Sequence, residues 1–295
     1  MSRDTSKAPD GLRVLIIGGG VAALETMLAL RTLAEDRVDL ELLAPESHFW
    51  YRPLSVAEPF DLGEAHHFEL AALTAARGAR FTPGMLASVD RDSRVARAGN
   101  GLELPYDVLV LAAGARAEPF LDDALTFRGP ADTEAFRLLL DDAEAGKVRR
   151  LVFTFPGEAA WPLPAYELAL LTATRLDEQG VGGVEIVIVT PESRPLGVFG
   201  AAASEAIERL LLERGIALHT GRHPLDARAG VLRLAPEGRV GFDRLVALPR
   251  LRGWPIEGIP QDRNGFVATD GHGQVEGIDD IYAAGDIASF PVKQG

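Results

Sequence analysis

Residues 13–34, RVLIIGGGVAALETMLALRTLA, decide the fold. The stretch from Arg13 to Ile17 is short, apolar and partly β-branched, which is typical of a strand buried on both faces of a parallel sheet. Three glycines follow, and between Val21 and Leu33 the strong helix formers alanine, leucine and methionine dominate. The segment therefore predicts a strand, a glycine turn and a helix.

A second strand-like stretch, residues 38–43, lies about 20 residues beyond the glycines and completes a βαβ unit. Gly18, Gly20 and Ala23 fill the pattern G-x-G-x-x-[GA] at the turn. The first glycine permits the tight turn, the second lets the backbone approach a pyrophosphate, and the alanine allows close packing of helix on strand. The pattern predicts a dinucleotide site whose phosphates meet the helix N-terminus; the alternative is a tight turn that binds nothing.

The rest of the chain alternates between apolar strand-like stretches and helical ones. This alternation predicts an α/β protein with mainly parallel sheets. Residues 47–60 are aromatic and contain prolines, so we expect them to be irregular or short-helical. The expected strands are 106–114, 151–155, 184–189, 216–219 and 281–284, and the expected helices are 68–77, 130–145, 166–176 and 202–214.

Composition excludes several classes of protein. The 43 acidic residues outnumber the 30 basic ones, giving a net charge of −13, which argues against binding to nucleic acid or to an anionic membrane. The 295 residues include no cysteine, which excludes disulfides, zinc–thiolate sites and thiol nucleophiles within them. No apolar run reaches the roughly 18–20 residues that span a bilayer, and the polar N-terminus lacks a signal-peptide core. We expect a cytoplasmic protein.

Histidines and serines form no catalytic or metal-binding pattern. The six histidines are scattered apart from the adjacent His66 and His67, and no H-E-x-x-H motif is present. No serine lies in a G-x-S-x-G elbow. The sequence therefore predicts no metal site and disfavours a hydrolase.

Three motifs in order carry a resemblance to a known group: GGGVAALE at 18–25, YDVLVLAAGA at 106–115 and IYAAGDI at 281–287. The chain resembles the FAD-dependent pyridine nucleotide-disulfide oxidoreductases, flavoproteins with two dinucleotide-binding domains. Within them it is most similar to the sulfide:quinone oxidoreductase and type II NADH dehydrogenase branch. The resemblance implies a discontinuous FAD-binding domain, residues 1–128 plus 255–295, and a second Rossmann-like domain, residues 129–254, of the NAD(P)-binding type.

The resemblance also implies which residues bind FAD. Asp286 would meet the ribityl and pyrophosphate side, although an aspartate there can equally cap a helix. Where Ala113 replaces the threonine of the family turn, only its backbone role carries over. The implied FAD-binding residues are Gly18, Gly19, Gly20, Val21, Ala22, Ala23, Ala113, Gly114, Gly285 and Asp286.

The flavin ring has its own candidate residues, Lys293 and Pro53, which we predict to be catalytic. Lys293 lies in PVKQG, which is similar to the family's lysine-bearing run facing the ring, and its charge would stabilise an anionic reduced flavin. Pro53 and Arg52 lie in FWYRPLSVAEPF, similar to the family's aromatic-x-x-Pro segment beside the flavin. The alternatives are a lysine at a frayed terminus and a rigid surface turn.

The ribose-binding acid is not at its usual place. The fingerprint expects Asp or Glu at the end of the second strand, but our preferred register puts Ala44 there. Glu46, two residues later, can reach the ribose from the loop or serve only as a surface charge.

Two departures limit the transfer of function. Sulfide:quinone oxidoreductases carry sulfur on cysteines, and this chain has none. The loop after the first strand of the second domain, PGEAAWPLPAYELALL, contains only Gly157, which disfavours an NAD(P)H site there.

We therefore predict an FAD-dependent oxidoreductase that transfers two electrons through the flavin from a small-molecule donor to a quinone-like or other small acceptor. The alternatives are an NAD(P)H dehydrogenase with an atypical nicotinamide site and a non-catalytic flavin-binding module. Members of the family continue beyond the position equivalent to Gly295, with a part that completes the ring pocket and, in some, a peripheral membrane contact or a homodimer contact. Without such a part we expect FAD to bind weakly.

Overall fold

The computed structural model describes residues 11–157 and 161–289, and the chain divides into two compact units. Unit 1 contains the residues up to Trp50, then His67–Arg116 and the residues from Arg252 onward. Unit 2 contains Tyr51–His66 and Ala117–Leu251. Both units are therefore discontinuous in sequence, and each is described by itself.

Unit 1 is built on a five-stranded parallel sheet in the order β20-β9-β1-β2-β5. The first strand is central because it pairs with β2 on one side and β9 on the other; Val14 lies opposite both Leu40 and Val108. The strands are β1 (Leu12–Ile17), β2 (Val38–Ala44), β5 (Arg80–Pro83), β9 (Val108–Leu111) and β20 (Ile281–Ala283).

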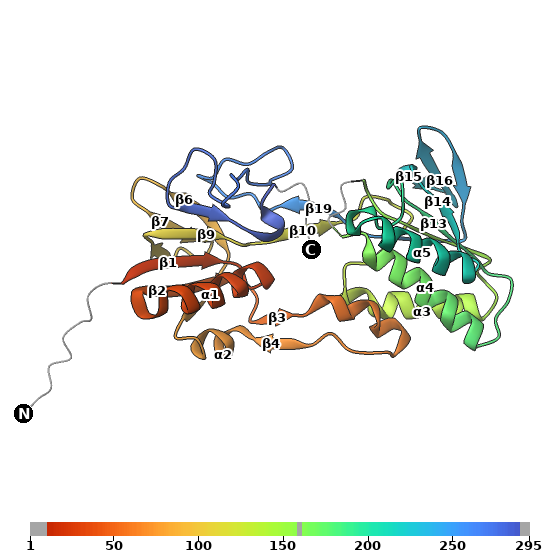
Figure 1. The fold of residues 1–295 in the computed structure, drawn as a ribbon, viewed down its shortest axis with the longest axis horizontal. Helices are drawn as coiled ribbons and strands as arrows, with labels where there is room; N and C mark the ends of the chain where they lie inside the picture. Colours follow the sequence, from red (N-terminus) through yellow and green to blue (C-terminus); the bar gives the residue numbers. More distant parts are fainter. Residues whose placement is uncertain (1–10, 158–160, 290–295) are drawn as a thin grey trace, which may run out of the picture. The chain divides into compact units, whose positions relative to one another are not determined.

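Alternate residues of β1 face two different layers, as the pleat of a strand requires. Val14 and Ile16 belong to the cluster that contains Ala23 and Met27 of helix α1 (Val21–Ala34), which lies along β1 and β2 in Figure 1. Leu15 and Ile17 belong to the cluster formed with a three-stranded antiparallel sheet. Its strands are β6 (Leu86–Asp90), β7 (Val95–Ala98) and β8 (Glu103–Pro105).

A two-stranded antiparallel ribbon, β3 (His48–Trp50) with β4 (His67–Glu69), completes unit 1. We expected a helix from residue 68, but α2 spans Leu70–Ala75 because His67–Glu69 pairs with β3. The remaining short elements of this unit are the 3-10 turns η1 (Glu35–Arg37) and η6 (Gly285–Ile287).

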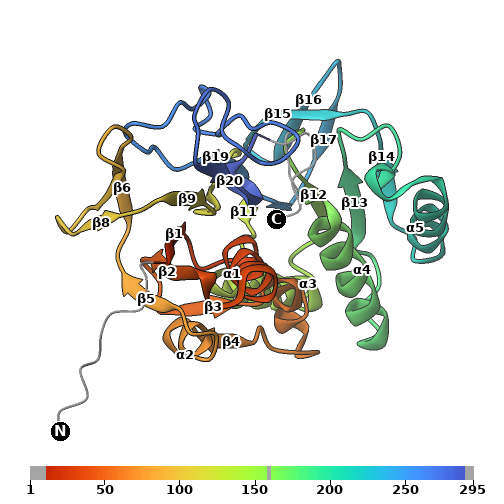
Figure 2. The same cartoon turned by 60° about the vertical axis from the view of Figure 1, so that its left-hand side comes forward.

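Unit 2 repeats this plan. Its parallel sheet has the order β11-β18-β12-β13-β14, with β11 (Leu125–Thr126), β12 (Arg150–Thr154), β13 (Glu185–Val189), β14 (Ala217–His219) and β18 (Arg244–Ala247). An antiparallel sheet covers one face, with β15 (His223–Arg228), β16 (Val231–Ala235) and β17 (Arg239–Gly241). Helices α3 (Thr133–Glu144) and α4 (Leu163–Glu178) pack on the other face, as Figure 2 shows for α4 beside β12 and β13.

Short elements fill the rest of unit 2. The predicted short-helical segment forms η2 (Arg52–Val56) and η3 (Glu58–Phe60), and the others are η4 (Pro130–Asp132), η5 (Gly197–Phe199) and α5 (Ala201–Glu213). The strand pair β10 (Ala115–Glu118) and β19 (Arg250–Gly253) contains two of the four points where the chain passes between the units. The predicted α/β class with mainly parallel sheets is confirmed.

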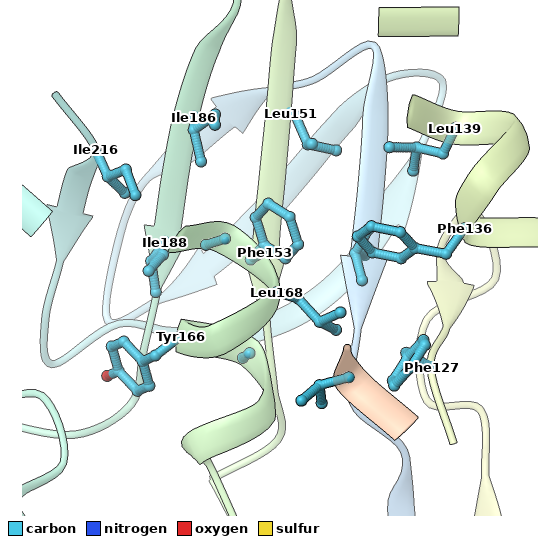
Figure 3. Packing of buried hydrophobic residues seen from close by; sticks show 14 of the residues in the cluster. Phe127, Phe136, Leu139, Leu151, Phe153, Tyr166, Leu168, Ile186, Ile188 and Ile216 are labelled. Carbon is cyan, nitrogen blue, oxygen red and sulfur yellow. The ribbon is translucent and has the colours of Figure 1, made fainter. Parts of the chain in front are cut away.

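The core of unit 2 centres on Phe136 of α3, which is fully buried. Its ring centroid lies 5.6 Å from that of Phe60, 5.9 Å from that of Phe127 and 6.4 Å from that of Phe153. Figure 3 shows Phe127 and Phe153 on either side of it, with Leu139 one turn along α3. Aromatic pairs of this spacing stabilise a core beyond the area they bury.

Removing this ring should destabilise the protein strongly. We expect Phe136→Ala to lower the free energy of unfolding by about 3–5 kcal/mol, because the cavity cannot collapse between three other rings. Leu138→Ala on the same helix, at a side chain 57% exposed, should change it by less than about 0.5 kcal/mol. Urea unfolding followed by circular dichroism measures both, and equal effects would contradict this account of the core.

The amino ends of β1 and β9 are tied together by Arg13 and Asp107. The Asp107 carboxylate accepts hydrogen bonds from the backbone N–H of Arg13 at 2.8 Å and from its Nε and Nη2 at 3.0 and 2.7 Å. The Arg13 guanidinium, followed by its backbone N–H, lowers the pKa of Asp107 to about 2. A lowered carboxyl pKa means that the ionised form is preferentially stabilised by folding.

This pair should make stability depend on pH in acid. Because the folded pKa of Asp107 is below its ordinary value of 3.8, its contribution is complete above that value and is lost as pH falls towards about 2. We expect wild type to be more stable than Asp107→Asn at neutral pH and the difference to shrink as pH falls below about 4. Urea titrations of both proteins at several pH values measure the difference; a constant difference would be inconsistent with the ion pair.

Candidate functional site

The carboxyl ends of four strands meet at one edge of the parallel sheet in unit 1. Gly18 N donates to Leu43 O at 2.8 Å, Ala112 N donates to Ile17 O at 2.8 Å, and Ala284 N donates to Leu111 O at 2.9 Å. These bonds connect the residues that follow β1, β9 and β20 into one row. In open α/β sheets, ligands bind outside the carboxyl ends of the strands.

Gly18 is required by the backbone at this edge. Its φ is +118°, and a Cβ built on it would lie 2.1 Å from the carbonyl oxygen of Ala112. Only glycine adopts this conformation without strain, and only glycine leaves room for the neighbouring strand end. The tight turn predicted for this position is present.

Gly19 packs against a residue that the sequence analysis did not single out. A Cβ at Gly19 would lie 2.5 Å from Cδ1 of Leu70, which is fully buried at the start of α2. The sequence feature that could have pointed to Leu70 is its position directly after residues 67–69. The Leu70 side chain packs against the glycine turn at Gly19, but it has no polar group that could bind a ligand.

Gly20 has open space at its Cβ position, whereas the Cβ positions of Gly18 and Gly19 are crowded. No atom lies within 4 Å of the position its Cβ would take, and its φ is −87°. It caps α1 without a side-chain hydrogen bond, and no acidic residue occupies the first turn of that helix. The first N–H groups of a helix have no acceptor within it, so this turn presents donors and a partial positive charge towards open space. An anion such as a pyrophosphate fits this cradle.

Gly285 brings the third motif onto the first turn of α1. Its φ is +71°, and a Cβ built on it would lie 2.9 Å from the Cβ of Ala22. Asp286 therefore follows directly on a residue that touches the glycine-turn helix, although the two motifs lie at opposite ends of the sequence. A carboxylate beside a phosphate cradle can accept hydrogen bonds from sugar hydroxyls.

The other predicted residues of this edge follow β9 and β2. Ala113 and Gly114 are half-buried after β9, and Gly114 has a φ of +66° with open space around its Cβ position. Ala44 ends β2 and is fully buried, as the preferred register predicted, and Glu46 is exposed two residues further on.

Three predicted residues do not belong to this edge as the structure describes it. Arg52 and Pro53 are exposed on η2, which is part of unit 2. Lys293 lies outside the described residues. The roles of all three beside a flavin ring stay predictions.

The corresponding edge of unit 2 differs in its backbone. Pro156 is buried after β12, and a Cβ at Gly157 would lie 3.2 Å from Nδ1 of His223. Helix α4 is capped by Pro162 and has Pro164 in its first turn, which has no N–H to donate. This helix N-terminus offers fewer donors to a phosphate than that of α1.

A partly buried hydrogen-bond network involves the acid of this second edge. Glu192, which follows β13, accepts from the hydroxyl of Tyr166 at 2.6 Å and from Oγ1 of Thr190 at 3.1 Å. Burial raises the pKa of Tyr166, so its hydroxyl keeps its proton and remains a donor. One oxygen of the carboxylate that would bind ribose hydroxyls in a dinucleotide fold, Oε2, is thus engaged inside the unit. The sequence analysis missed this network.

Metal and membrane features are absent from the described residues. Within 11–157 and 161–289, no three His, Asp or Glu side chains gather in a way that would bind a metal ion. Across the same part of the chain, every helix is too short or too polar to cross a bilayer.

Comparison with known proteins adds an independent line of information. Residues 163–294 match the family model described as pyridine nucleotide-disulphide oxidoreductase. A sulfide-quinone reductase of Aquifex aeolicus is 27% identical over 214 residues, which are 69% of this chain and 49% of that protein. An NADH dehydrogenase-like protein of Mycobacterium tuberculosis is 27% identical over 299 aligned residues, covering 94% of this chain and 73% of that protein. The chain therefore spans about half the length of the first of these relatives.

Solved structures share the fold. The crystal structure of the Aquifex aeolicus sulfide:quinone oxidoreductase has a TM-score of 0.86 at 20% identity, covering 96% of this chain and 70% of that one. NDH2 of Plasmodium falciparum, solved in complex with NADH, has a TM-score of 0.73 at 17% identity, covering 94% and 64%. The motifs, the family model and the fold agree that this chain is similar to the pyridine nucleotide-disulphide oxidoreductases, a family of oxidoreductase enzymes.

Proposed function

We propose that this chain binds FAD at the carboxyl edge of unit 1 and acts as an FAD-dependent oxidoreductase with a quinone-like or other small acceptor. The observation that supports this most directly is the approach of Gly285 to Ala22, which brings the glycine turn and the Asp286 motif together. A dinucleotide needs both at once: donors for its phosphates and an acceptor for its sugar hydroxyls.

Each group at this edge has a role in that proposal. The N–H groups of residues 18–23 bind the pyrophosphate, and Asp286 accepts hydrogen bonds from ribityl hydroxyls. The backbone at Ala113 and Gly114 lines the cofactor without a bulky side chain, and Glu46 holds the adenosine ribose. When bound, FAD supplies two-electron chemistry that protein side chains lack.

The proposed contacts with the flavin ring involve residues that the family resemblance implies. Pro53 and Arg52 would orient the flavin ring or its access path, and Lys293 would stabilise negative charge on it. The acceptor is proposed to be quinone-like because a sulfide-quinone reductase is among the relatives. Residues 1–295 contain no cysteine, so a persulfide cannot form on this chain and the donor must be oxidised by another route.

The glycine turn allows a sharp test of FAD binding. Gly20→Ala should leave the free energy of unfolding within about 0.5 kcal/mol, because its φ suits alanine and its Cβ meets nothing, yet lower FAD affinity by about tenfold or more by intruding on the pyrophosphate. Flavin fluorescence titrations measure the affinity, and thermal unfolding measures the stability.

Two other glycines serve as controls. Gly182→Ala, also in open space but in unit 2, should bind FAD as wild type does, whereas Gly18→Ala should destabilise the fold itself. Unchanged FAD affinity in Gly20→Ala, or a wild type that binds no FAD at all, would refute the proposed site.

A second candidate function is an NAD(P)H dehydrogenase. The NADH dehydrogenase-like relative, aligned over 94% of this chain, favours it. The prolines of the α4 N-terminus oppose it, because they remove phosphate donors, and Oε2 of Glu192 already accepts from Tyr166 and Thr190. A third candidate, a flavin-binding module without turnover, has no observation of its own in its favour.

Anaerobic spectroscopy separates the three candidates. We expect NADH and NADPH to leave the visible absorbance of the FAD-loaded protein unchanged, and menadione to restore that absorbance after dithionite reduction. Rapid bleaching by NADH would instead support the dehydrogenase. Failure of menadione and of other small acceptors to re-oxidise the bound flavin would support the non-catalytic module.

A further inference from the structure

Unit 2 contains a cavity of about 500 Å³ that no part of the proposed function uses. Leu125, at the start of β11, and Arg244, at the start of β18, both line it, so it lies at the amino ends of the parallel strands. The dinucleotide edges of such sheets are at the opposite, carboxyl ends. The cavity is therefore separate from the edge that contains Glu192, and its volume is within the range of small-molecule sites.

One wall of the cavity is a single stripe of helix α3. Ala135, Leu138, Leu139 and Asp142 line it, and their spacing of three and four residues puts them on one face of the helix. Leu138 is 57% exposed although its neighbour Leu139 is buried in the core. The stripe thus offers an apolar surface that the unit itself leaves partly uncovered.

Two further lining residues, from outside α3, are also apolar. Phe242 and Leu245 line the cavity beside the turn at Gly230, and Leu245 is buried in the cluster that joins the two sheets of unit 2. An occupant with an apolar body would bury Leu138 and Phe242 together. Burial of apolar surface drives such binding in proportion to the area removed from water.

Two carboxylates at the rim have spare acceptor capacity. Oδ2 of Asp123 accepts from the N–H of Ala229 at 2.9 Å, and Oδ2 of Asp243 accepts from the N–H groups of Arg149 and Arg150 at 2.8 and 2.9 Å. Neither Oδ1 has a hydrogen bond or ion pair within the part of the chain that the structure describes. The backbone donors lower the pKa of Asp243, so it is ionised at neutral pH.

The cation of the cavity is already neutralised. Arg244 Nη2 bonds Oδ2 of Asp142 at 2.9 Å, while Lys147 Nζ bonds Oδ1 of the same carboxylate at 2.9 Å. Both oxygens of Asp142 are therefore engaged, and the ion pair of Arg244 is with Asp142. Among the described residues, Asp123 and Asp243 are the lining carboxylates that form no ion pair, although the charges of Arg149 and Arg244 act on Asp243.

We propose that this cavity is a binding site for a small organic cation, an ammonium or amidinium group carried on an apolar body. The cation bonds the free oxygens of Asp123 and Asp243, and the apolar body packs on Leu138 and Phe242. Charge-assisted hydrogen bonds to carboxylates are about twice as strong as neutral ones, which selects a cation over a neutral ligand of the same shape. Anions are excluded by the same carboxylates. The proposal does not depend on FAD or on the proposed oxidoreductase activity.

A matched set of probes tests the charge selection on the full chain. Naphthylmethylamine is a cation at neutral pH, naphthylmethanol is its neutral counterpart and naphthylacetate its anionic one. We expect the amine to bind in isothermal titration calorimetry and in saturation-transfer NMR, the alcohol to bind about tenfold more weakly, and the acetate not to bind.

Substitutions locate the binding. Leu138→Lys puts a positive charge on the apolar wall at an exposed position and should abolish amine binding, and Asp123→Asn should weaken it by about tenfold while its amide oxygen still accepts from Ala229. Leu212→Lys on α5, at a leucine 80% exposed and outside the cavity, is the matched control and should bind as wild type does. Circular dichroism checks that each variant is folded.

Several results would overturn the proposal. These are equal binding of amine and alcohol, no binding of the amine, or undiminished binding in folded Leu138→Lys. A fourth is a wild-type dimer, seen by sedimentation velocity, that becomes a monomer in Leu138→Lys but not in Leu212→Lys. That result would assign the α3 stripe to self-association instead.

Discussion

The site in unit 1 depends on a backbone contact that is too close for any side chain. Gly18 passes so near the carbonyl oxygen of Ala112 that a methyl group in its place would overlap it. The hydrogen bonds from Ala112 to Ile17 and from Ala284 to Leu111 continue the same close row across β9 and β20. Because these strand ends are hydrogen-bonded side by side, the backbone next to the open turn at Gly20 is held in place. A preorganised backbone of this kind lowers the entropy cost of binding, because the loop does not have to become ordered when the ligand binds.

The two units show how one architecture can present different groups at equivalent edges. Both place a parallel sheet between helices and a three-stranded antiparallel sheet. Unit 1 has a glycine turn and a helix start rich in free N–H groups, whereas α4 of unit 2 starts among prolines and Glu192 bonds Tyr166. The fold supplies the edge, and the residues at the edge decide what it can bind.

Local sequence patterns predicted most of the fold. The run 13–34 gave the expected strand, turn and helix, and the α/β class follows from the same alternation along the chain. Helix α4 begins at Leu163, before the predicted body at Tyr166, because a proline is well tolerated in the first turn of a helix. The boundary at Leu70 was missed because strand pairing with β3 overrides the helical propensity of residues 68 and 69.

Tertiary partners explain what could not be predicted. Nothing local in the sequence couples Tyr166 to Glu192, since the bond forms only when α4 packs on the sheet that carries β13. The support of Gly19 by Leu70 and the cavity beside α3 likewise arise from segments far apart in the chain. The ligand roles of Glu46, Asp286 and Lys293 stay predictions, because they rest on a motif and a resemblance.

The interleaving of the two units bears on how the protein is made. Unit 1 lacks its outer strand β20 until residues 281–283 have been synthesised, and the Phe60 that packs on Phe136 in unit 2 is translated long before α3. Neither unit can therefore finish folding during synthesis in the order in which its residues emerge. Apolar side chains of early segments must therefore wait for late segments before they are buried.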